Sequence, residues 1–97
     1  MATSTSKRSK ESKKIPVQRV QTGVRIENRL LKVLKALAEY HDMSLGDLLE
    51  GIVLHVFEDK TPFCDTTLAK IQQLKSVYGL DFGAEFSHRM IDRQEDS

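Results

Sequence analysis

The amino-acid sequence predicts a mainly α-helical protein with one β-strand that forms an intertwined homodimer. Two copies are expected to share an intermolecular two-stranded antiparallel ribbon, and a C-terminal helical extension follows. Three observations predict this class. One segment alternates apolar and polar residues as a strand does, most of the chain beyond it has the spacing of amphipathic helices, and no second strand candidate appears. A lone strand leaves backbone groups unpaired, so its partner must come from another chain.

Length and composition exclude several classes of protein. The 97 residues are enough for one small domain, and no window approaches the length of a transmembrane span. The N-terminus lacks the apolar core of a signal peptide, so we expect a cytoplasmic protein without membrane contact. Cys64 is the single cysteine, so an internal disulfide is excluded, and three scattered histidines add no metal-ligand spacing. No catalytic triad, carboxylate pair or Gly-rich phosphate loop has supporting context, so we expect no enzymatic activity and no cofactor.

The charge is distributed unevenly along the chain. Residues 1–25 hold seven Lys and Arg and one Glu, a net charge of +6, whereas residues 26–97 hold eight basic and thirteen acidic residues, a net charge of −5. This asymmetry indicates an anionic partner at the N-terminal end. Residues 1–14 have almost no apolar side chains, and the segment 1–17 is expected to form a disordered basic arm. The arm is either a solubilising tail or a segment that follows a nucleic-acid backbone, with Lys13 and Lys14 as contacts.

The predicted strand lies in the run RVQTGVRIEN, residues 19–28. Its two faces are Val20, Thr22, Val24 and Ile26 on one side, and Arg19, Gln21, Gly23 and Arg25 on the other. Chains below about 40 residues rarely fold without disulfides, metal or oligomerisation, and the strand with the next two helices is about that long. Because disulfides and metal are excluded, we expect the strand to pair with its own copy across a two-fold axis.

Two amphipathic helices are expected directly after the strand. The first covers residues 28–41 and has apolar residues at i, i+3, i+4, i+7 and i+8. Asp42 can take the left-handed conformation that ends a helix, and Ser44, with an acidic residue three positions later, resembles a capping box. The second helix, residues 45–58, is apolar over most of its surface, which indicates that a second chain supplies part of its cover. Gly51 in its middle indicates close approach of another helix.

A break at Thr61-Pro62 separates these helices from the rest of the chain. Asp65 is expected to cap a third helix over residues 66–78, and Gly79 is expected to end it. A shorter helix is expected over residues 82–92, followed by a polar tail.

The run TGVRIENRLLKVLKALAEYHDMSLGDLLEGIVLHVF resembles the ribbon-helix-helix DNA-binding domains of the Arc, methionine-repressor and CopG-like type. The matching features are the strand end VRI, the helix LLKVLKALAEY, a short turn before Ser44, and the run LLEGIVLHVF. Two positions depart from the family pattern. Asp42 stands where Gly is common, and Glu27-Asn28 stands where Asp or Ser is common. The resemblance divides the chain into the arm 1–17, a ribbon-helix-helix domain 18–59, and a C-terminal helical extension 60–97.

The family implies a homodimer that lays its ribbon in the major groove of duplex DNA, which admits a two-stranded ribbon. The base-contacting residues would be Gln21, Gly23 and Arg25. The residues that contact the DNA backbone would be Arg19, Lys13, Lys14, and Ser44, Leu45 and Gly46 at the N-terminus of the second helix. The dimer core would contain Val24, Ile26, Leu34, Leu48, Ile52 and Val56. Gly23 either lets the backbone approach DNA closely or leaves a position without readout.

The expected function is therefore sequence-specific DNA binding, as a plasmid or chromosomal transcriptional repressor or regulator. Two alternatives stay open: an antitoxin, and a protein-interaction module that keeps the dimer without sequence reading. Residues 61–92 do not match the family. They either extend the dimer core, join dimers along DNA or bind a protein partner.

Overall fold

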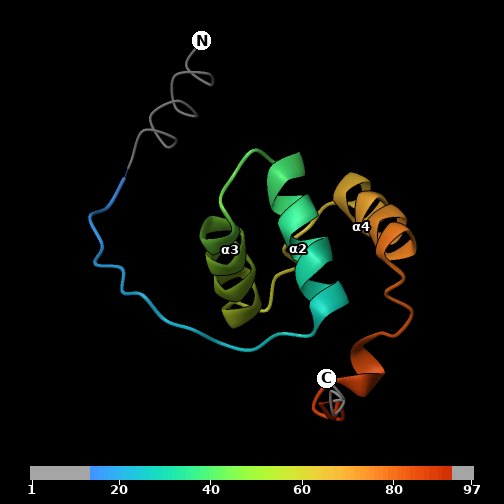
Figure 1. Ribbon diagram of the computed structural model, residues 1–97. Coiled ribbons are helices and arrows are strands. Elements are labelled where there is room, and N and C mark those ends of the chain that lie inside the picture. The colour runs from blue at the N-terminus through green and yellow to red at the C-terminus, as the bar shows by residue number, and fades with distance from the viewer. Residues whose placement is uncertain (1–13, 93–97) are drawn as a thin grey trace.

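Helix α2 (Asn28–Tyr40) lies between α3 (Leu45–Phe57) and α4 (Asp65–Tyr78) and packs against both, and a short 3₁₀ turn, η1 (Ala84–Phe86), follows (Figure 1). The structure is a computed structural model that describes residues 14–92, and these residues form an all-α fold. The expectations for residues 1–13 and for the polar tail 93–97 lie outside the described residues. Within residues 14–92, no helix is long and apolar enough to cross a membrane.

The three main helices match the predicted ones to within one residue at each end, and most of their predicted ends are confirmed. Asp42 takes a left-handed conformation with φ 59°, which ends α2. The backbone N–H of Asp47 donates to Ser44 Oγ (3.1 Å), so Ser44 caps α3 as predicted. Gly79 is left-handed with φ 70° and ends α4. The prediction for Asp65 is wrong, because Cys64 is the N-cap residue and Asp65 lies inside the first turn.

The helix predicted over residues 82–92 is wrong. The segment contains only the single turn η1, and the rest of it is irregular up to Asp92. Gly83 before the turn is extended (φ −130°, ψ −159°), and His88 after it is left-handed with φ 67°. Neither conformation continues an α-helix. The i, i+4 spacing of Phe82 and Phe86 places the two rings edge to face, with their centroids 6.0 Å apart, without a helix.

The strand predicted at residues 20–26 is not formed in the single chain, and no strand is present in residues 14–92. The physical reason is that no segment within residues 14–92 pairs with it. No backbone hydrogen bond joins residues 14–26 to another described residue. The segment runs as an irregular trace past α3 to the start of α2 (Figure 1). The intermolecular ribbon therefore stays a prediction about the dimer.

The core lies where the three helices meet. Its buried residues are Leu37, Ala38 and Leu48, and Leu34, Ile52, Phe63, Ile71 and Leu74 pack against them. Phe63, Ile71 and Leu74 come from the segment beyond residue 60. This part of the C-terminal extension therefore shares one core with α2 and α3.

Arg29 joins the C-terminal segment to the start of α2. Its Nη1 donates to the carbonyl of Gly79 (3.1 Å) and lies 3.6 Å from Asp81, while its Nε donates to Glu27 (2.9 Å). The guanidinium also lies over the ring of Phe82, 5.3 Å from the centroid. Glu27 in turn caps α2 by accepting the N–H of Leu30 (2.8 Å). The end of α4 is thereby fixed beside the point where the predicted strand meets α2.

Replacing Leu37 with Ala should lower the free energy of unfolding by about 2–5 kcal/mol, because this side chain is almost completely buried and its loss leaves a cavity. Urea unfolding followed by circular dichroism at one fixed protein concentration measures the change. Val77→Ala is the control, because Val77 is 72% exposed on α4. Equal midpoints for the two variants would contradict the assignment of Leu37 to the core.

Candidate nucleic-acid interface

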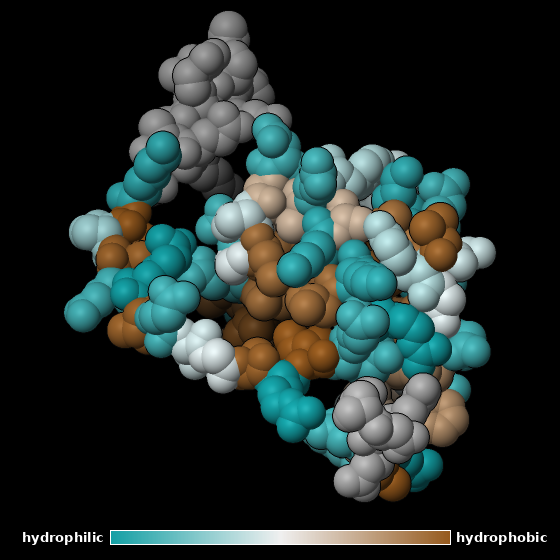
Figure 2. All heavy atoms as spheres, viewed as in Figure 1, coloured by the Kyte–Doolittle hydropathy of each residue, from teal (hydrophilic) through white to brown (hydrophobic). Residues whose placement is uncertain are grey.

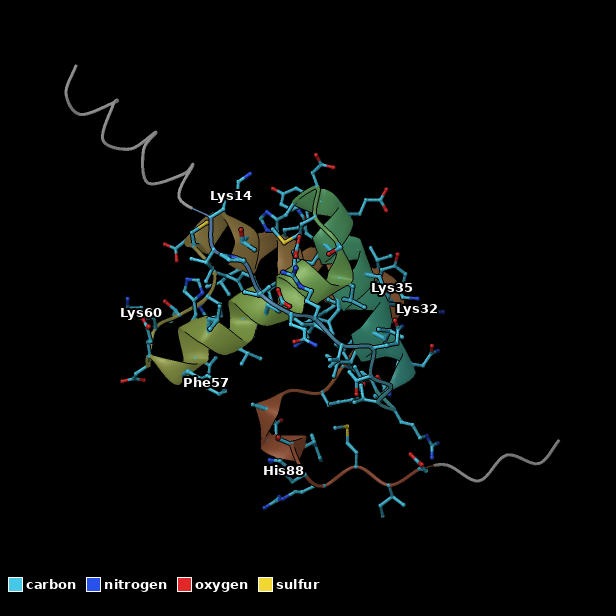
Figure 3. The ribbon with its side chains drawn as sticks, turned by 90° about the vertical axis from the view of Figure 1, so that its left-hand side faces the viewer. Lys14, Lys32, Lys35, Phe57, Lys60 and His88 are labelled. Carbon is cyan, nitrogen blue, oxygen red and sulfur yellow. The ribbon has the colours of Figure 1, made fainter. Side chains whose placement is uncertain are left out.

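The segment expected to read DNA lies on the outside of the molecule. Gln21, Gly23 and Arg25 are exposed, as the prediction requires. Val20 and Val24 on the opposite face are also exposed (75% and 73%), and Ile26 is half-buried. Figure 3 shows the segment running from Lys14 across α3 toward the start of α2. Both its backbone and its apolar face are therefore available to a partner.

Arg19 is bound to α3. Its Nε and Nη2 donate to the two carboxylate oxygens of Glu50 (2.9 and 2.8 Å), and Nη2 lies 3.7 Å from Asp47 Oδ1. The hydrogen bond from Arg19, followed by the attraction of its charge, lowers the pKa of Glu50 below the ordinary glutamate value. The same contact raises the pKa of Arg19. This pair fixes the N-terminal segment against α3, a role that the sequence pattern did not indicate.

Arg25 also has a carboxylate partner within the chain. Its Nη2 lies 2.9 Å from Asp92 Oδ2, and both side chains are mostly exposed (87% and 78%). The C-terminal segment thus reaches the arginine that was expected to contact bases. Sequence spacing gave no signal for this pair, because the two residues lie far apart in the sequence and both belong to irregular segments.

The N-terminus of α3 has the geometry expected of an anion site, but its charge is mixed. Helical hydrogen bonding begins with the Leu48 N–H, which donates to the Ser44 carbonyl, so the N–H groups of Leu45 and Gly46 have no helical acceptor. A Cβ at Gly46 would meet only Ser44 Oγ, at 3.9 Å, so the approach is open. The acidic Asp47 in the same turn weakens the attraction for a phosphate.

The six residues predicted to form the dimer core divide into three groups. Leu48 is buried within the chain, Leu34 and Ile52 are partly buried against it and Ile26 is half-buried, and Val24 and Val56 are exposed (73% and 57%). More of the outer surface of α3 is apolar and exposed: Val53 (43%), Leu54 (63%) and Phe57 (79%). Figure 2 shows hydrophobic atoms gathered over α3 and the adjoining part of α2, beside a hollow that the N-terminal segment borders. This surface has no cover within residues 14–92.

Gly51 does not have the neighbour that its position indicates. No atom lies within 4 Å of the place where its Cβ would be, apart from its own helix and adjacent residues. The prediction that another helix approaches Gly51 is therefore not met within the described chain. A helix at this distance would have to come from a second molecule.

Other polar groups do not assemble a second site in the described part of the chain. Lys32 and Lys35 lie on α2, well away from Lys14 (Figure 3). The thiol of Cys64 is exposed, and its hydrogen bond with the Thr67 hydroxyl is the main cause of a lowered pKa. Residues 14–92 contain no group of three or more His, Cys, Asp or Glu side chains placed to hold a metal ion.

Comparison of the chain with known protein families, curated proteins and solved structures found no match.

The Arg19–Glu50 contact should make the stability of the fold depend on pH. Because the pKa of Glu50 is lower in the folded chain than in the unfolded one, the pair stabilises the fold above the unfolded-state pKa. That contribution is lost as the pH falls through the folded-state pKa. NMR titration of the Glu50 carboxyl should show the lowered pKa, and Arg19→Gln should return it to the ordinary range.

Arg89→Gln is the matched control for this titration, because Arg89 is exposed and forms no ion pair among the described residues. It removes the same charge without touching Glu50. A Glu50 titration that is identical in wild type and Arg19→Gln would show that the pair does not form in solution.

Proposed function

We propose that the protein is a homodimer that binds duplex DNA through a two-stranded ribbon and acts as a transcriptional repressor or regulator. One observation carries this proposal. Residues 14–26 form no backbone hydrogen bond to another described residue, and Val20 and Val24 within them are exposed beside an uncovered apolar surface of α3. A second copy of the same chain supplies what both features lack.

The dimer follows from self-complementarity. Antiparallel pairing of two copies of residues 20–26 satisfies the backbone of both strands with one surface, which is the property of a two-fold interface. The pairing also turns both sets of apolar strand residues toward the helices. There they meet the exposed stripe of α3 that includes Val53, Val56 and Phe57. The burial of this apolar surface is the main favourable term in association.

DNA as the partner follows from the other face of the ribbon. In the paired form, Gln21 and Arg25 point away from the helices on both strands. Arg is suited to guanine O6 and N7, and Gln to adenine N6 and N7, in a groove that admits a two-stranded ribbon. The net charge of +6 on residues 1–25 supports an anionic partner at this end of the chain. A DNA-binding role is consistent with the cytoplasmic location expected from the sequence.

The ion pairs of the free chain are compatible with this role. Arg19 and Arg25 are each bound to a carboxylate of their own chain, and all four side chains are substantially exposed. Exposed ion pairs contribute little to stability, because water screens them. We infer that both guanidinium groups exchange these carboxylates for phosphate oxygens or base edges when DNA binds.

A second candidate function is favoured by the C-terminal segment. Phe86, Met90 and Ile91 are exposed (45%, 51% and 90%) in the C-terminal segment. An apolar group of this kind suits a protein partner, as in an antitoxin or an interaction module. Co-purification of a small protein that is lost on deletion of residues 82–92 would support this candidate, and retention of that protein by the deletion variant would count against it.

Selection from a pool of random-sequence duplexes should yield a preferred site for the wild-type protein. Arg25→Ala should weaken binding to that site by about 1–3 kcal/mol and relax the preference at one position in each half-site. Arg89→Ala is the control, because it removes an equal exposed charge from the C-terminal segment. The absence of any preferred duplex would overturn sequence-specific binding, and equal losses for the two variants would remove Arg25 from the readout.

The wild-type protein should sediment as a dimer at micromolar concentration, and Val24→Glu should shift it to the monomer because the charge would lie inside the ribbon's apolar face. Val24 is 73% exposed in the single chain, so the variant should keep the helical core and its circular dichroism spectrum. Val77→Glu is the matched control, since Val77 is 72% exposed on α4. A folded wild-type monomer at this concentration would refute the dimer.

A further inference from the structure

The ribbon has a register that the residues themselves select. In a symmetric antiparallel pair, one residue of each strand lies on the two-fold axis opposite its own copy. Apolar residues must stay opposite apolar residues, since a shift of one residue would move them to the other face. The strand then offers three registers near its centre, with Thr22, Gly23 or Val24 on the axis.

The apolar face favours the register centred on Gly23. There, Val20 lies opposite the partner's Ile26, and Thr22 lies opposite the partner's Val24, so all four positions of this face are matched. With Thr22 on the axis, Ile26 would lie opposite the polar Gln18. With Val24 on the axis, Val20 would lie opposite Asn28, which already belongs to α2.

The polar face gives an independent reason for the same register. With Thr22 on the axis, Arg19 would lie directly opposite the partner's Arg25, and like charges in this position are destabilising. With Gly23 on the axis, Arg19 lies opposite the partner's Glu27, and Gln21 lies opposite the partner's Arg25. This register thus places no like charges opposite each other and sets the amide oxygen of Gln21 beside each Arg25.

Neither the backbone conformation nor close packing explains why residue 23 is a glycine. Gly23 does not have a positive φ, whereas Gly79 does. A Cβ at Gly23 would have no atom within 4 Å apart from its chain neighbours. Neither the local backbone nor the packing of the single chain therefore requires glycine here, and its use is to be sought in the assembled ribbon.

We propose that Gly23 lies on the two-fold axis of the dimer, and that the base-reading unit is a composite of Gln21 from one chain and Arg25 from its partner. This inference rests on the proposed function for its role in reading DNA. Each ribbon then carries two such units, related by the axis and separated by two glycines without side chains. Sequence preference should accordingly fall in two inverted half-sites, with base pairs between them that are not selected.

Cysteine cross-linking distinguishes the three registers. Cys64 is exposed, so the three variants Thr22→Cys, Gly23→Cys and Val24→Cys are made in a Cys64→Ser background. Residues directly opposite each other have Cα atoms about 4.5–5.5 Å apart, within the range of a disulfide, whereas diagonal neighbours are about 7–8 Å apart. Under mild oxidation, Gly23→Cys should form a covalent dimer fastest. The open space at Gly23 makes this substitution compatible with the fold.

A mixture of Val20→Cys and Ile26→Cys chains in the same background checks the register away from the axis. It should give a covalent heterodimer, while each variant alone should give little cross-linked product. Fastest cross-linking of Thr22→Cys or Val24→Cys would instead establish one of the other registers and overturn the composite reading unit.

Selection of random duplexes with the wild-type protein, which keeps glycine at position 23, separates this inference from the proposed function when it is set beside the cross-linking result. Cross-linking through residue 23 together with two inverted half-sites supports both. Cross-linking without any preferred duplex upholds the register and overturns DNA reading. A preferred duplex together with cross-linking only through residue 22 or 24 overturns the register and leaves DNA binding in place.

Discussion

The packing of Leu37 where α2, α3 and α4 meet is the constraint on which the rest of the structure depends. Leu37 and Ala38 on α2 form a buried cluster with Leu48 on α3, and α4 reaches it through Ile71 and Leu74. Each helix contributes apolar side chains to this one cluster. No helix in residues 14–92 is then left to cover the N-terminal segment or the outer side of α3. The uncovered surface is thus a direct consequence of how the core is built.

Charged contacts join the irregular segments to this core. Arg19 holds the N-terminal segment against α3 through Glu50, and Arg29 holds the C-terminal segment against the start of α2 through Gly79 and Asp81. The two ends meet where Arg25 contacts Asp92. The basic head and acidic body of the sequence are therefore in contact with each other in the free chain. When the protein binds DNA as proposed, phosphate oxygens compete with the chain's own carboxylates for the same guanidinium groups.

The proposed dimer supplies both backbone hydrogen bonds for the N-terminal segment and apolar cover for α3. Backbone groups of residues 14–26 need donors and acceptors, and Val53, Val56 and Phe57 need apolar cover. A second copy of the chain meets both needs with one symmetric surface. The open position beside Gly51 is consistent with a helix arriving from outside the chain. The composite reading unit extends the same reasoning, since the partner supplies half of each contact to DNA.

The sequence by itself determined the three main helices and most of their ends, because apolar spacing and the local chemistry of Ser44, Asp42 and Gly79 act within a few residues. It also identified the segment that has no backbone partner among the described residues. It failed at residues 82–92, where the spacing of Phe82 and Phe86 mimics a helix but Gly83 and His88 take conformations that end one. Only the tertiary structure decided that α4 joins the core of α2 and α3, and that Arg19 and Arg25 are bound to Glu50 and Asp92. Those contacts join residues 31 or more positions apart, so they depend on how the helices pack and leave no periodic signal in the sequence.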